Sequence, residues 1–377
     1  FGNTLENIQR DPTSLHDVHC PWEYQGTENQ YKLYNHGTSL LHSEFGVEGI
    51  TNRKTLDTVI RPENQWPISL ETNPYWWHLG AWWVKRDVWD EIFGELPHVD
   101  SYIKATQFTQ FDGLRYALEA DQRRKYQNSG TLPSQFNEHY PMAAFTSAVD
   151  YFSQPKPVYY AVVQAYKPIT VTARFEKITW MELETFASEI WVSNSNLNEA
   201  INVILDIRIV GESGKVFYEE TVQVHFAGNQ STCIAKMQYQ LLEIEKIFFL
   251  DLVLKDSAGE KMTNNRYMFI SASKLTPMLH VEPTHITAQL AGRDDQRNLH
   301  IENSGKHTAM YIWLEDAREL TAAGFVYFDQ NYFCLFPGES RFVQIDWKDV
   351  PKEERRLEMK GWNTNSVRIG ENGISEV

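Results

Sequence analysis

The spacing of apolar residues along the chain changes near residue 168. Before this point, helix-like and strand-like patterns are mixed, whereas after it apolar and polar residues mostly alternate. A period of 3.6 is typical of an amphipathic helix, and a period of two is typical of a half-buried strand. The pattern therefore predicts an α/β segment followed by an all-β segment.

The first segment contains alternating strand and helix signals. The apolar run in Thr38–Phe45 and the short Thr131–Phe136 read as strands, while Ser101–Tyr126 has helical spacing and no proline. Thr146–Tyr166 is amphipathic but contains two prolines, so we expect any helix there to be interrupted and to resume at Val158. The order strand, helix, strand, helix favours α/β construction.

The second segment predicts two β-sandwiches separated by the proline-containing linker Ser273–Pro283. The clearest strand is Ile201–Ile209, which is followed by a glycine-rich hairpin turn. The other expected strands are Val216–Phe226, Ser231–Tyr239, Phe248–Leu254, His285–Leu290, Leu299–Glu302, Ala309–Leu314, Arg341–Trp347 and Leu357–Lys360.

These patterns divide the chain into residues 1–167, 168–276 and 277–377. The first piece is shorter than the roughly 200–250 residues of a closed (β/α)8 barrel. It is therefore interpreted either as a small complete α/β layer domain or as the C-terminal part of a barrel. The other two pieces are expected to be immunoglobulin-like sandwiches.

Composition removes several functional classes. The net charge of −15 disfavours a nucleic-acid partner, because phosphate recognition needs a basic face. No apolar run is long enough for a membrane span, so no membrane partner is expected. Cys20, Cys233 and Cys334 lack the spacing of a zinc site or a disulfide framework. The segment 16–19 has two His at i, i+3 with an Asp between them, but the spacing fixes no convincing third ligand, and we expect neither metal nor cofactor.

One candidate for chemistry is His42-Ser43-Glu44-Phe45-Gly46, which places a carboxylate at the end of a buried strand. Barrel enzymes place catalytic groups at such positions, and a carboxylate can attack the anomeric carbon of a sugar. From spacing alone, a glutamate that caps a neighbouring loop is the favoured interpretation.

Two other segments have residues suited to sugars. Seven of the 12 tryptophans lie before residue 90, with adjacent pairs at 76–77 and 82–83. Their faces suit pyranose rings, although ordinary packing explains most individual members. The segment Gln135–Tyr140 has amides and a carboxylate that suit sugar hydroxyls, and a hydrogen-bonded turn explains it equally well.

Together, several motifs resemble glycoside hydrolase family 2, in particular its β-mannosidase and exo-β-glucosaminidase-like branch. The nucleophile motif of that family is similar to 42–46. The remaining motifs occur in the family's order and are Val18–Trp22, Leu132–Glu138, Pro155–Val162 and Asp329–Glu339. The resemblance implies the C-terminal part of a (β/α)8 barrel followed by two immunoglobulin-like sandwiches.

The resemblance also implies a retaining exo-β-glycosidase that hydrolyses terminal β-mannosides, β-glucosaminides or β-galactosides. Glu44 would be the nucleophile, and the acid/base glutamate would lie upstream of this chain. The chain alone would then be inactive. The substrate-binding residues implied by the matching motifs are His19, Trp22, Phe136, Asn137 and Glu138.

The sequence departs from the family at two positions. Ser134 stands where the family has tryptophan before Gln135, and Cys20 stands where many relatives have glycine. Loss of the tryptophan would weaken the floor of the sugar subsite, which puts normal substrate binding in question.

The expected partners are a glycoside or oligosaccharide substrate and the upstream part of the same protein, with an oligomer as another means of covering exposed strand edges. Two alternatives stay open. One is a non-catalytic carbohydrate-binding or interaction module with a degenerate barrel remnant. The other is a small complete α/β hydrolytic domain whose sheet closes on itself.

Overall fold

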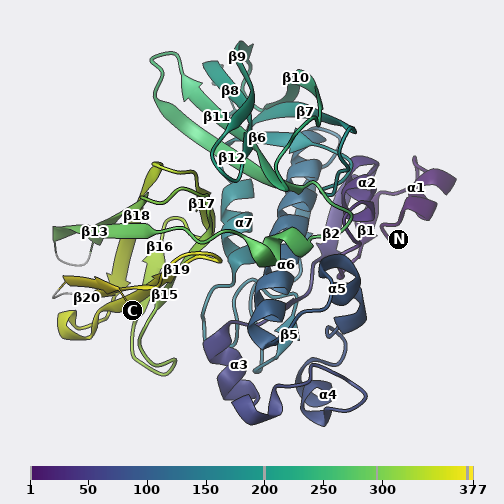
Figure 1. Ribbon diagram of the computed structural model, residues 1–377. Coiled ribbons are helices and arrows are strands. Elements are labelled where there is room, and N and C mark those ends of the chain that lie inside the picture. Colours follow the sequence, from purple (N-terminus) through teal and green to yellow (C-terminus); the bar gives the residue numbers. More distant parts are fainter. Residues whose placement is uncertain (1, 198–200, 294–295, 371–372, 377) are drawn as a thin grey trace. The chain divides into compact units, whose positions relative to one another are not determined.

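The computed structural model describes residues 2–197, 201–293, 296–370 and 373–376 (Figure 1). The chain forms two compact units. The first comprises Phe1–Gly211 and Val216–Pro277, and the second comprises Glu212–Lys215 and Met278–Val377. Each unit has its own hydrophobic core.

The α-helices among the described residues all lie in the first half of the chain. They are α1 (Leu5–Arg10), α2 (Asn29–Asn35), α3 (Arg53–Val59), α4 (Pro74–Gly80), α5 (Arg86–Phe93), α6 (Val99–Arg123) and α7 (Pro157–Ala165).

The strands of the first unit are β1 (Asp17–His19), β2 (Leu41–Phe45), β3 (Gly49–Ile50), β4 (Gly130–Pro133), β5 (Ala144–Phe145), β6 (Ile169–Arg174), β7 (Thr185–Asn194), β8 (Ile201–Gly211), β9 (Val216–Phe226), β10 (Gln230–Gln240), β11 (Ile247–Asp256) and β12 (Lys261–Ile270). Those of the second unit are β13 (Ile286–Arg293), β14 (Gln296–Asn303), β15 (Ala309–Asp316), β16 (Phe325–Phe328), β17 (Phe333–Leu335), β18 (Ser340–Lys348), β19 (Arg356–Lys360), β20 (Val367–Gly370) and β21 (Gly373–Glu376).

The N-terminal part of the first unit is built on a three-stranded parallel sheet in the order β1-β2-β4. Helix α2 connects β1 to β2, α6 precedes β4, and α7 follows it. Parallel strands need such crossovers because the chain must return to the same end of the sheet. The sheet is open among the described residues, so it does not close on itself as a complete hydrolytic domain of the alternative kind would.

Helix α6 lies beside α7 (Figure 1). It is buried along most of its length. It starts two residues before the expected Ser101 because the His98 side chain accepts a hydrogen bond from the Ser101 N–H and caps the first turn. Its Gln110 side chain donates to the Val47 and Phe145 carbonyls at 2.9 and 3.1 Å. The helix thereby holds the segments after β2 and in β5.

The amphipathic Thr146–Tyr166 segment is helical only in its second half, over α7. The Asp150 carboxylate accepts hydrogen bonds from the backbone N–H groups of Phe152 and Gln154. This turn satisfies the backbone locally, so the segment before Pro157 does not form a helix.

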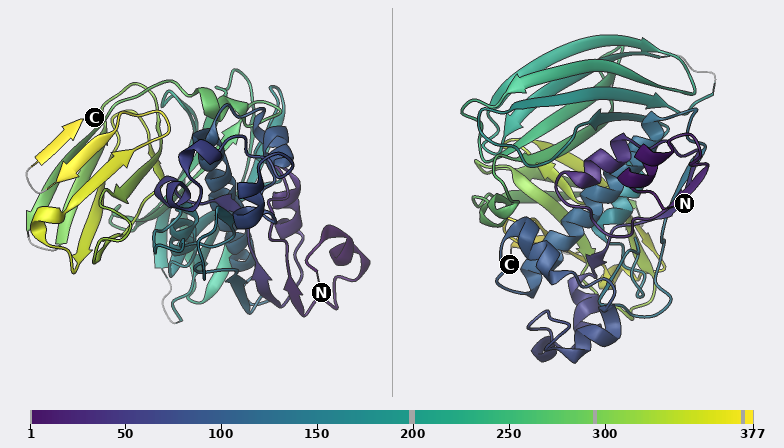
Figure 2. Two further views of the ribbon diagram at one scale, coloured as in Figure 1. Left: turned by 90° about the horizontal axis from the view of Figure 1, so that it is seen from below. Right: turned by 90° about the vertical axis from the view of Figure 1, so that its right-hand side faces the viewer.

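Residues 169–270 form the first sandwich, with sheets β10-β7-β6 and β12-β11-β8-β9. Its long, curved strands are seen in the right-hand view of Figure 2. The alternation predicted for β8 is confirmed, since Val203, Leu205 and Ile207 are buried. Strand β7 was not predicted, although its buried Phe186 and Ile190 alternate with outward-facing residues.

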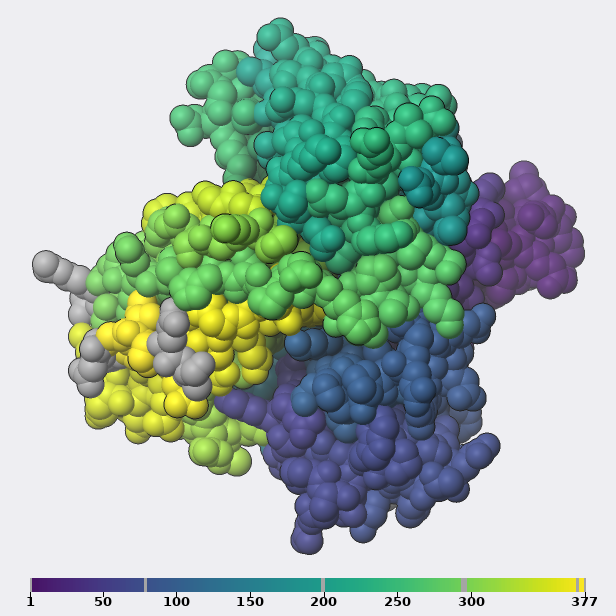
Figure 3. All heavy atoms as spheres, viewed as in Figure 1, coloured from purple at the N-terminus to yellow at the C-terminus, as the bar shows by residue number. Residues whose placement is uncertain are grey.

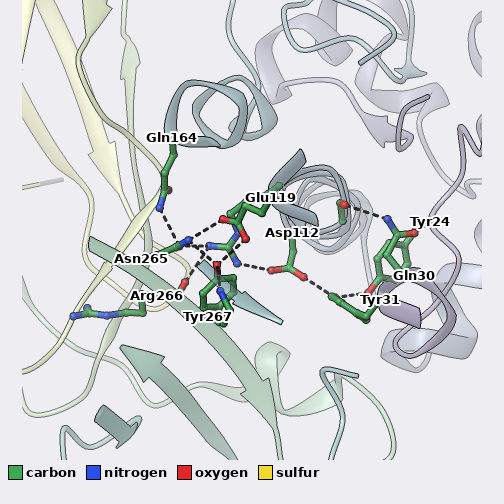
Figure 4. A network of polar contacts seen from close by, with 12 residues as sticks. Tyr24, Gln30, Tyr31, Asp112, Glu119, Gln164, Asn265, Arg266 and Tyr267 are labelled. Atoms are coloured by element: carbon green, nitrogen blue, oxygen red, sulfur yellow. Dashed lines mark hydrogen bonds and ion pairs between the residues drawn. The ribbon is translucent and has the colours of Figure 1, made fainter. Parts of the chain in front are cut away.

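A buried polar network joins α6 to this sandwich within the first unit (Figure 4). Arg115 donates to Asp112 on its own helix at 2.7 Å and to Asn265 on β12 at 3.3 Å. Asn265 and Tyr267 both donate to the Glu119 carboxylate. Because buried polar groups destabilise the fold when they are unpaired, this network favours a single position of β12 against α6.

The second unit is a sandwich with sheets β13-β14-β18-β16 and β17-β15-β19-β20-β21. Within its Asp329–Glu339 motif, Asn331 pairs with both backbone groups of Leu314, and the Glu339 carboxylate accepts from the Phe336 N–H at 2.8 Å. The Asn331 bonds attach the motif to β15, and the Glu339 bond holds a turn within the motif, so these polar residues stabilise the sandwich.

Candidate functional site

The carboxyl ends of β1, β2 and β4 meet at one edge of the parallel sheet. The Cys20 N–H donates to the Glu44 carbonyl at 2.7 Å, and the Ser134 N–H donates to the Phe45 carbonyl at 2.6 Å. A further bond runs from the Gly46 N–H to the Pro21 carbonyl at 3.0 Å. The sheet thus brings three segments that are distant in sequence to one place.

Glu44 lies at this edge with an exposed side chain. Its neighbour Phe45 is fully buried, because successive residues of a strand point to opposite faces. His19 at the end of β1 is the register partner of Glu44. A carboxylate in this position is accessible to a ligand above the strand ends.

The other expected site residues flank Glu44 on both neighbouring segments. The rings of His19 and Trp22 lie 6.0 Å apart, with His19 exposed and Trp22 half-buried. After β4, Phe136 is 67% exposed and Asn137 is exposed. The structure therefore brings His19, Trp22, Phe136 and Asn137 to the same sheet edge as Glu44.

Glu138 has different surroundings from these residues. Its side chain is buried and accepts hydrogen bonds from the Ser147 hydroxyl at 2.7 Å and the Tyr151 N–H at 3.2 Å. Burial raises the pKa of this carboxyl, and the nearby Lys156 charge opposes the rise. The carboxylate holds the 138–151 loop, so its geometry suits loop support better than direct contact with a sugar.

A buried His42–Asp121 pair lies beneath the site edge. His42 Nδ1 lies 3.3 Å from an Asp121 carboxylate oxygen, and His42 Nε2 lies 3.1 Å from the Cys20 carbonyl oxygen. The imidazole also stacks on Phe45 at 4.0 Å. The motif 42–46 includes this histidine, yet its partner could not be identified from the sequence because 79 positions separate it from Asp121.

Glu48 is a second buried carboxyl beside the site that spacing did not identify. It accepts a hydrogen bond from the Tyr24 N–H at 2.9 Å and a longer one from the Trp89 indole at 3.4 Å. Burial raises the pKa of Glu48 to about 7. Its contacts fix the loop after β1, which carries Trp22, against α5.

The tryptophan-rich insertion, residues 66–89 between β3 and α6, contains both core and surface residues. Trp76 and Trp89 are fully buried, and the Trp76 indole donates to the Gln65 carbonyl at 3.1 Å. Trp77 and Trp82 are 59% and 82% exposed. The insertion forms much of the blue surface in Figure 3. Packing therefore explains some members, while others present aromatic faces to solvent.

Among the described residues, no group of three or more His, Cys, Asp or Glu side chains is arranged to hold a metal ion. In the part of the chain that the structure describes, Cys20, Cys233 and Cys334 form no disulfide. None of the helices described has the length and apolar content needed to cross a membrane.

Two family models match the β-rich part of the chain. Residues 187–272 match a mannosidase Ig/CBM-like domain, and residues 264–364 match an exo-β-D-glucosaminidase Ig-fold domain. Both descriptions agree with the sandwiches seen in the structure.

Among curated proteins, β-mannosidase B of Emericella nidulans is 27% identical over 229 residues, covering 57% of this chain and 26% of the relative. β-Mannosidase B of Aspergillus flavus is 26% identical over 52% of this chain and 24% of its own length. The chain therefore spans about a quarter of the length of these relatives.

Solved structures show the same fold over nearly the whole chain. A β-D-mannosidase from Dictyoglomus thermophilum superposes with a TM-score of 0.74 at 19% identity, covering 94% of this chain and 41% of that one. An exo-chitosanase of Amycolatopsis orientalis superposes with a TM-score of 0.69 at 14% identity, covering 96% and 45% respectively. The chain thus carries immunoglobulin-like domains of the exo-β-glucosaminidase and mannosidase type and fits the C-terminal part of a glycoside hydrolase family 2 protein.

Proposed function

We propose that the chain is the C-terminal part of a retaining exo-β-glycosidase and that Glu44 is its nucleophile. The observation that carries this proposal is the exposed Glu44 carboxylate at the joined ends of three parallel strands. The relatives named β-mannosidase support a terminal β-linked sugar as the substrate, namely a β-mannoside, β-glucosaminide or β-galactoside.

In this proposal, residues 1–167 are the last part of a (β/α)8 barrel, and residues 168–276 and 277–377 are the sandwiches. The three parallel strands alternating with α2, α6 and α7 support this assignment. Strands from the upstream part of the protein would pair with the outer edges of β1 and β4. Pairing would satisfy backbone groups that an open sheet leaves to solvent.

The proposed reaction is a double displacement. A Glu44 carboxylate oxygen attacks the anomeric carbon, and the glycosidic bond to the leaving oxygen breaks as a carboxylic acid from the upstream part protonates that oxygen. The resulting glycosyl ester is cleaved by water, which the same upstream group activates as a base. Such enzymes keep the two carboxyl groups about 5–5.5 Å apart.

Within the proposed pocket, the aromatic rings of His19, Trp22 and Phe136 shape the sugar site, and the Asn137 amide binds a hydroxyl. Aromatic faces suit the C–H groups of a pyranose, and amides both donate and accept hydrogen bonds. Glu138 would act on the pocket through the loop that it holds.

A second candidate function is glycan binding without hydrolysis. It is favoured by Ser134, which is half-buried at the carboxyl end of β4. The family that the sequence resembles has tryptophan at this position. A smaller side chain leaves less aromatic surface for the sugar. This candidate predicts glycan binding by the full-length protein with no hydrolysis.

The test uses the full-length protein and a panel of chromogenic β-glycosides. We expect turnover that Glu44→Gln nearly abolishes, because the amide is a poor nucleophile but preserves the side-chain shape. Glu23→Gln, at an exposed glutamate on the loop after β1, is the matched control and should keep activity. Normal turnover by Glu44→Gln would refute the nucleophile assignment, and binding without turnover by the unmodified protein would favour the second candidate.

A further inference from the structure

The His42 imidazole is enclosed by hydrogen-bond acceptors. One ring nitrogen faces the Asp121 carboxylate and the other faces the Cys20 carbonyl, and neither of those oxygens can donate a proton when Asp121 is ionised. A neutral imidazole has only one N–H, so it would leave one acceptor facing a bare nitrogen lone pair. Both contacts are satisfied only by the imidazolium, which has two N–H donors.

Asp121 is approached by further hydrogen-bond donors. Besides His42, it is approached by the Thr131 hydroxyl at 2.9 Å and the Arg124 guanidinium at 3.5 Å. The hydroxyl and the guanidinium both donate to the Asp121 carboxyl oxygens. The negative charge of Asp121 therefore faces a cation or a hydroxyl on each side.

The other groups packed around His42 do not compete for its proton. Burial raises the pKa of the Cys20 thiol, and burial holds the pKa of the Tyr34 hydroxyl on α2 well above its usual range. The pKa of Tyr166, which follows α7, is also raised by burial. These groups stay neutral, and Asp121 and Arg124 on or beside α6 provide the nearby charges.

The hydrogen bonds of Cys20 connect this pair to the reactive position. The Cys20 carbonyl contacts His42, and the Cys20 N–H donates to the Glu44 carbonyl at 2.7 Å. We propose that His42 is a positioning residue, held as an imidazolium between Asp121 and Cys20, which fixes the Cys20 backbone and thereby the Glu44 backbone beneath the sugar site. This inference rests on the proposed role of Glu44 and adds a residue that acts without touching the substrate.

The first experiment reads the His42 protons directly and needs no activity. The chain is prepared with ¹⁵N-labelled histidine, and the His42 signals are assigned by their absence in His42→Gln. We expect a proton bonded to each ring nitrogen at neutral pH, with exchange slowed by burial. A His42 ring that carries one bare nitrogen at neutral pH would overturn the imidazolium.

The second experiment measures kcat and KM in the full-length protein. His42→Leu removes both donors, and we expect kcat to fall about 10–100-fold with KM changed little, because support residues act through the geometry of the reacting group. His42→Gln has an amide that can still donate toward the Cys20 carbonyl and should lose less. The control His36→Gln, whose ring contacts the Lys32 carbonyl near the surface, should have an unchanged kcat.

The outcomes separate this inference from the proposed function. An unchanged kcat in His42→Leu, or equal losses in the Leu and Gln variants, would overturn the positioning role. If His42→Leu does not fold, His42→Ala takes its place, and an unchanged kcat in that variant overturns the positioning role. If Glu44→Gln has normal turnover and both His42 nitrogens carry a proton, the nucleophile assignment is refuted. The His42–Asp121 pair is then still supported.

Discussion

The phenol of Tyr267 on β12 donates a 2.6 Å hydrogen bond to the buried carboxylate of Glu119 on α6. The same carboxylate accepts from Asn265 at 2.7 Å, so each of its oxygens has a donor from the first sandwich. Burial raises the pKa of Glu119, and the Arg115 guanidinium opposes the rise. These hydrogen bonds join α6 to the first sandwich within one compact unit.

Replacing Tyr267 by Phe should lower the free energy of unfolding by about 1.5–3 kcal/mol, because it leaves a buried carboxylate oxygen without its donor. Chemical denaturation measures the change. Tyr218→Phe is the control, since its phenol also donates to a carboxylate, Glu220, but near the surface. We expect the control to change stability by less than about 0.5 kcal/mol. Similar losses in both variants would contradict the importance of burial.

Glu48 should make the chain less stable as the pH rises toward neutrality. Its pKa is raised from 4.5 to about 7 in the folded state, so the folded protein holds this proton between those values and the unfolded chain does not. The stabilisation is complete below about pH 4.5 and is lost as the pH rises through about 7. Between pH 4.5 and 8, the free energy of unfolding of Glu48→Gln should fall by about 3 kcal/mol less than that of the unmodified chain.

Denaturation at the two pH values measures this effect. Glu28→Gln is the matched control, because Glu28 is exposed at the end of the same loop and pairs with Lys32 at the surface. Its pH profile should follow that of the unmodified chain. A Glu48→Gln profile parallel to that of the unmodified chain would show that Glu48 does not cause the loss.

Gly46→Ala should distort the site edge. A methyl group at this position would lie 2.5 Å from the Ser134 carbonyl oxygen and 3.0 Å from the Thr146 Cβ. Ser134 cannot move away without straining its 2.6 Å bond to Phe45, so we expect a loss of about 1–3 kcal/mol of stability and reduced turnover by the full-length protein. Gly370→Ala has its nearest neighbour at 3.7 Å and should be tolerated. Equal stabilities of the two variants would argue against crowding at Gly46.

Ser134→Trp should strengthen glycoside binding by the full-length protein. Ser134 is half-buried at the end of β4, beside the segment that carries Phe136. An indole there would add an aromatic face to the proposed pocket, and one such contact corresponds to a decrease in KM of up to about tenfold. Leu132→Trp adds the same side chain at an exposed position on β4 and serves as the control. An effect of equal size in the control would place the gain outside the pocket.

The sequence alone predicted the features that depend on local periodicity. The helical spacing of Ser101–Tyr126 predicted α6 to within a few residues, and the alternation of Ile201–Ile209 predicted β8. The ends differ because caps such as His98 are side-chain contacts that hydrophobic spacing does not describe. The position of Glu44 near the end of β2 also followed from the order of residues along the chain.

Tertiary structure decided which polar side chains are free to act. Glu138 and Glu44 both follow or end strands in the sequence, yet Glu138 is buried on Ser147 while Glu44 is exposed. The tryptophans were likewise divided into core and surface by packing, with Trp76 buried and Trp82 exposed. Local spacing cannot distinguish these cases, because burial depends on segments that approach from elsewhere in the chain.

The sequence by itself therefore determined the elements with strong local periodicity, such as α6 and β8, and indicated Glu44 as a candidate for chemistry. The structure determined the partners of buried polar side chains, such as Asp121 for His42 across 79 positions and Glu119 for Tyr267 across 148. The physical reason is that hydrophobic periodicity is a property of neighbouring residues, whereas a buried hydrogen bond or ion pair forms only where the folded chain brings distant donors and acceptors within reach.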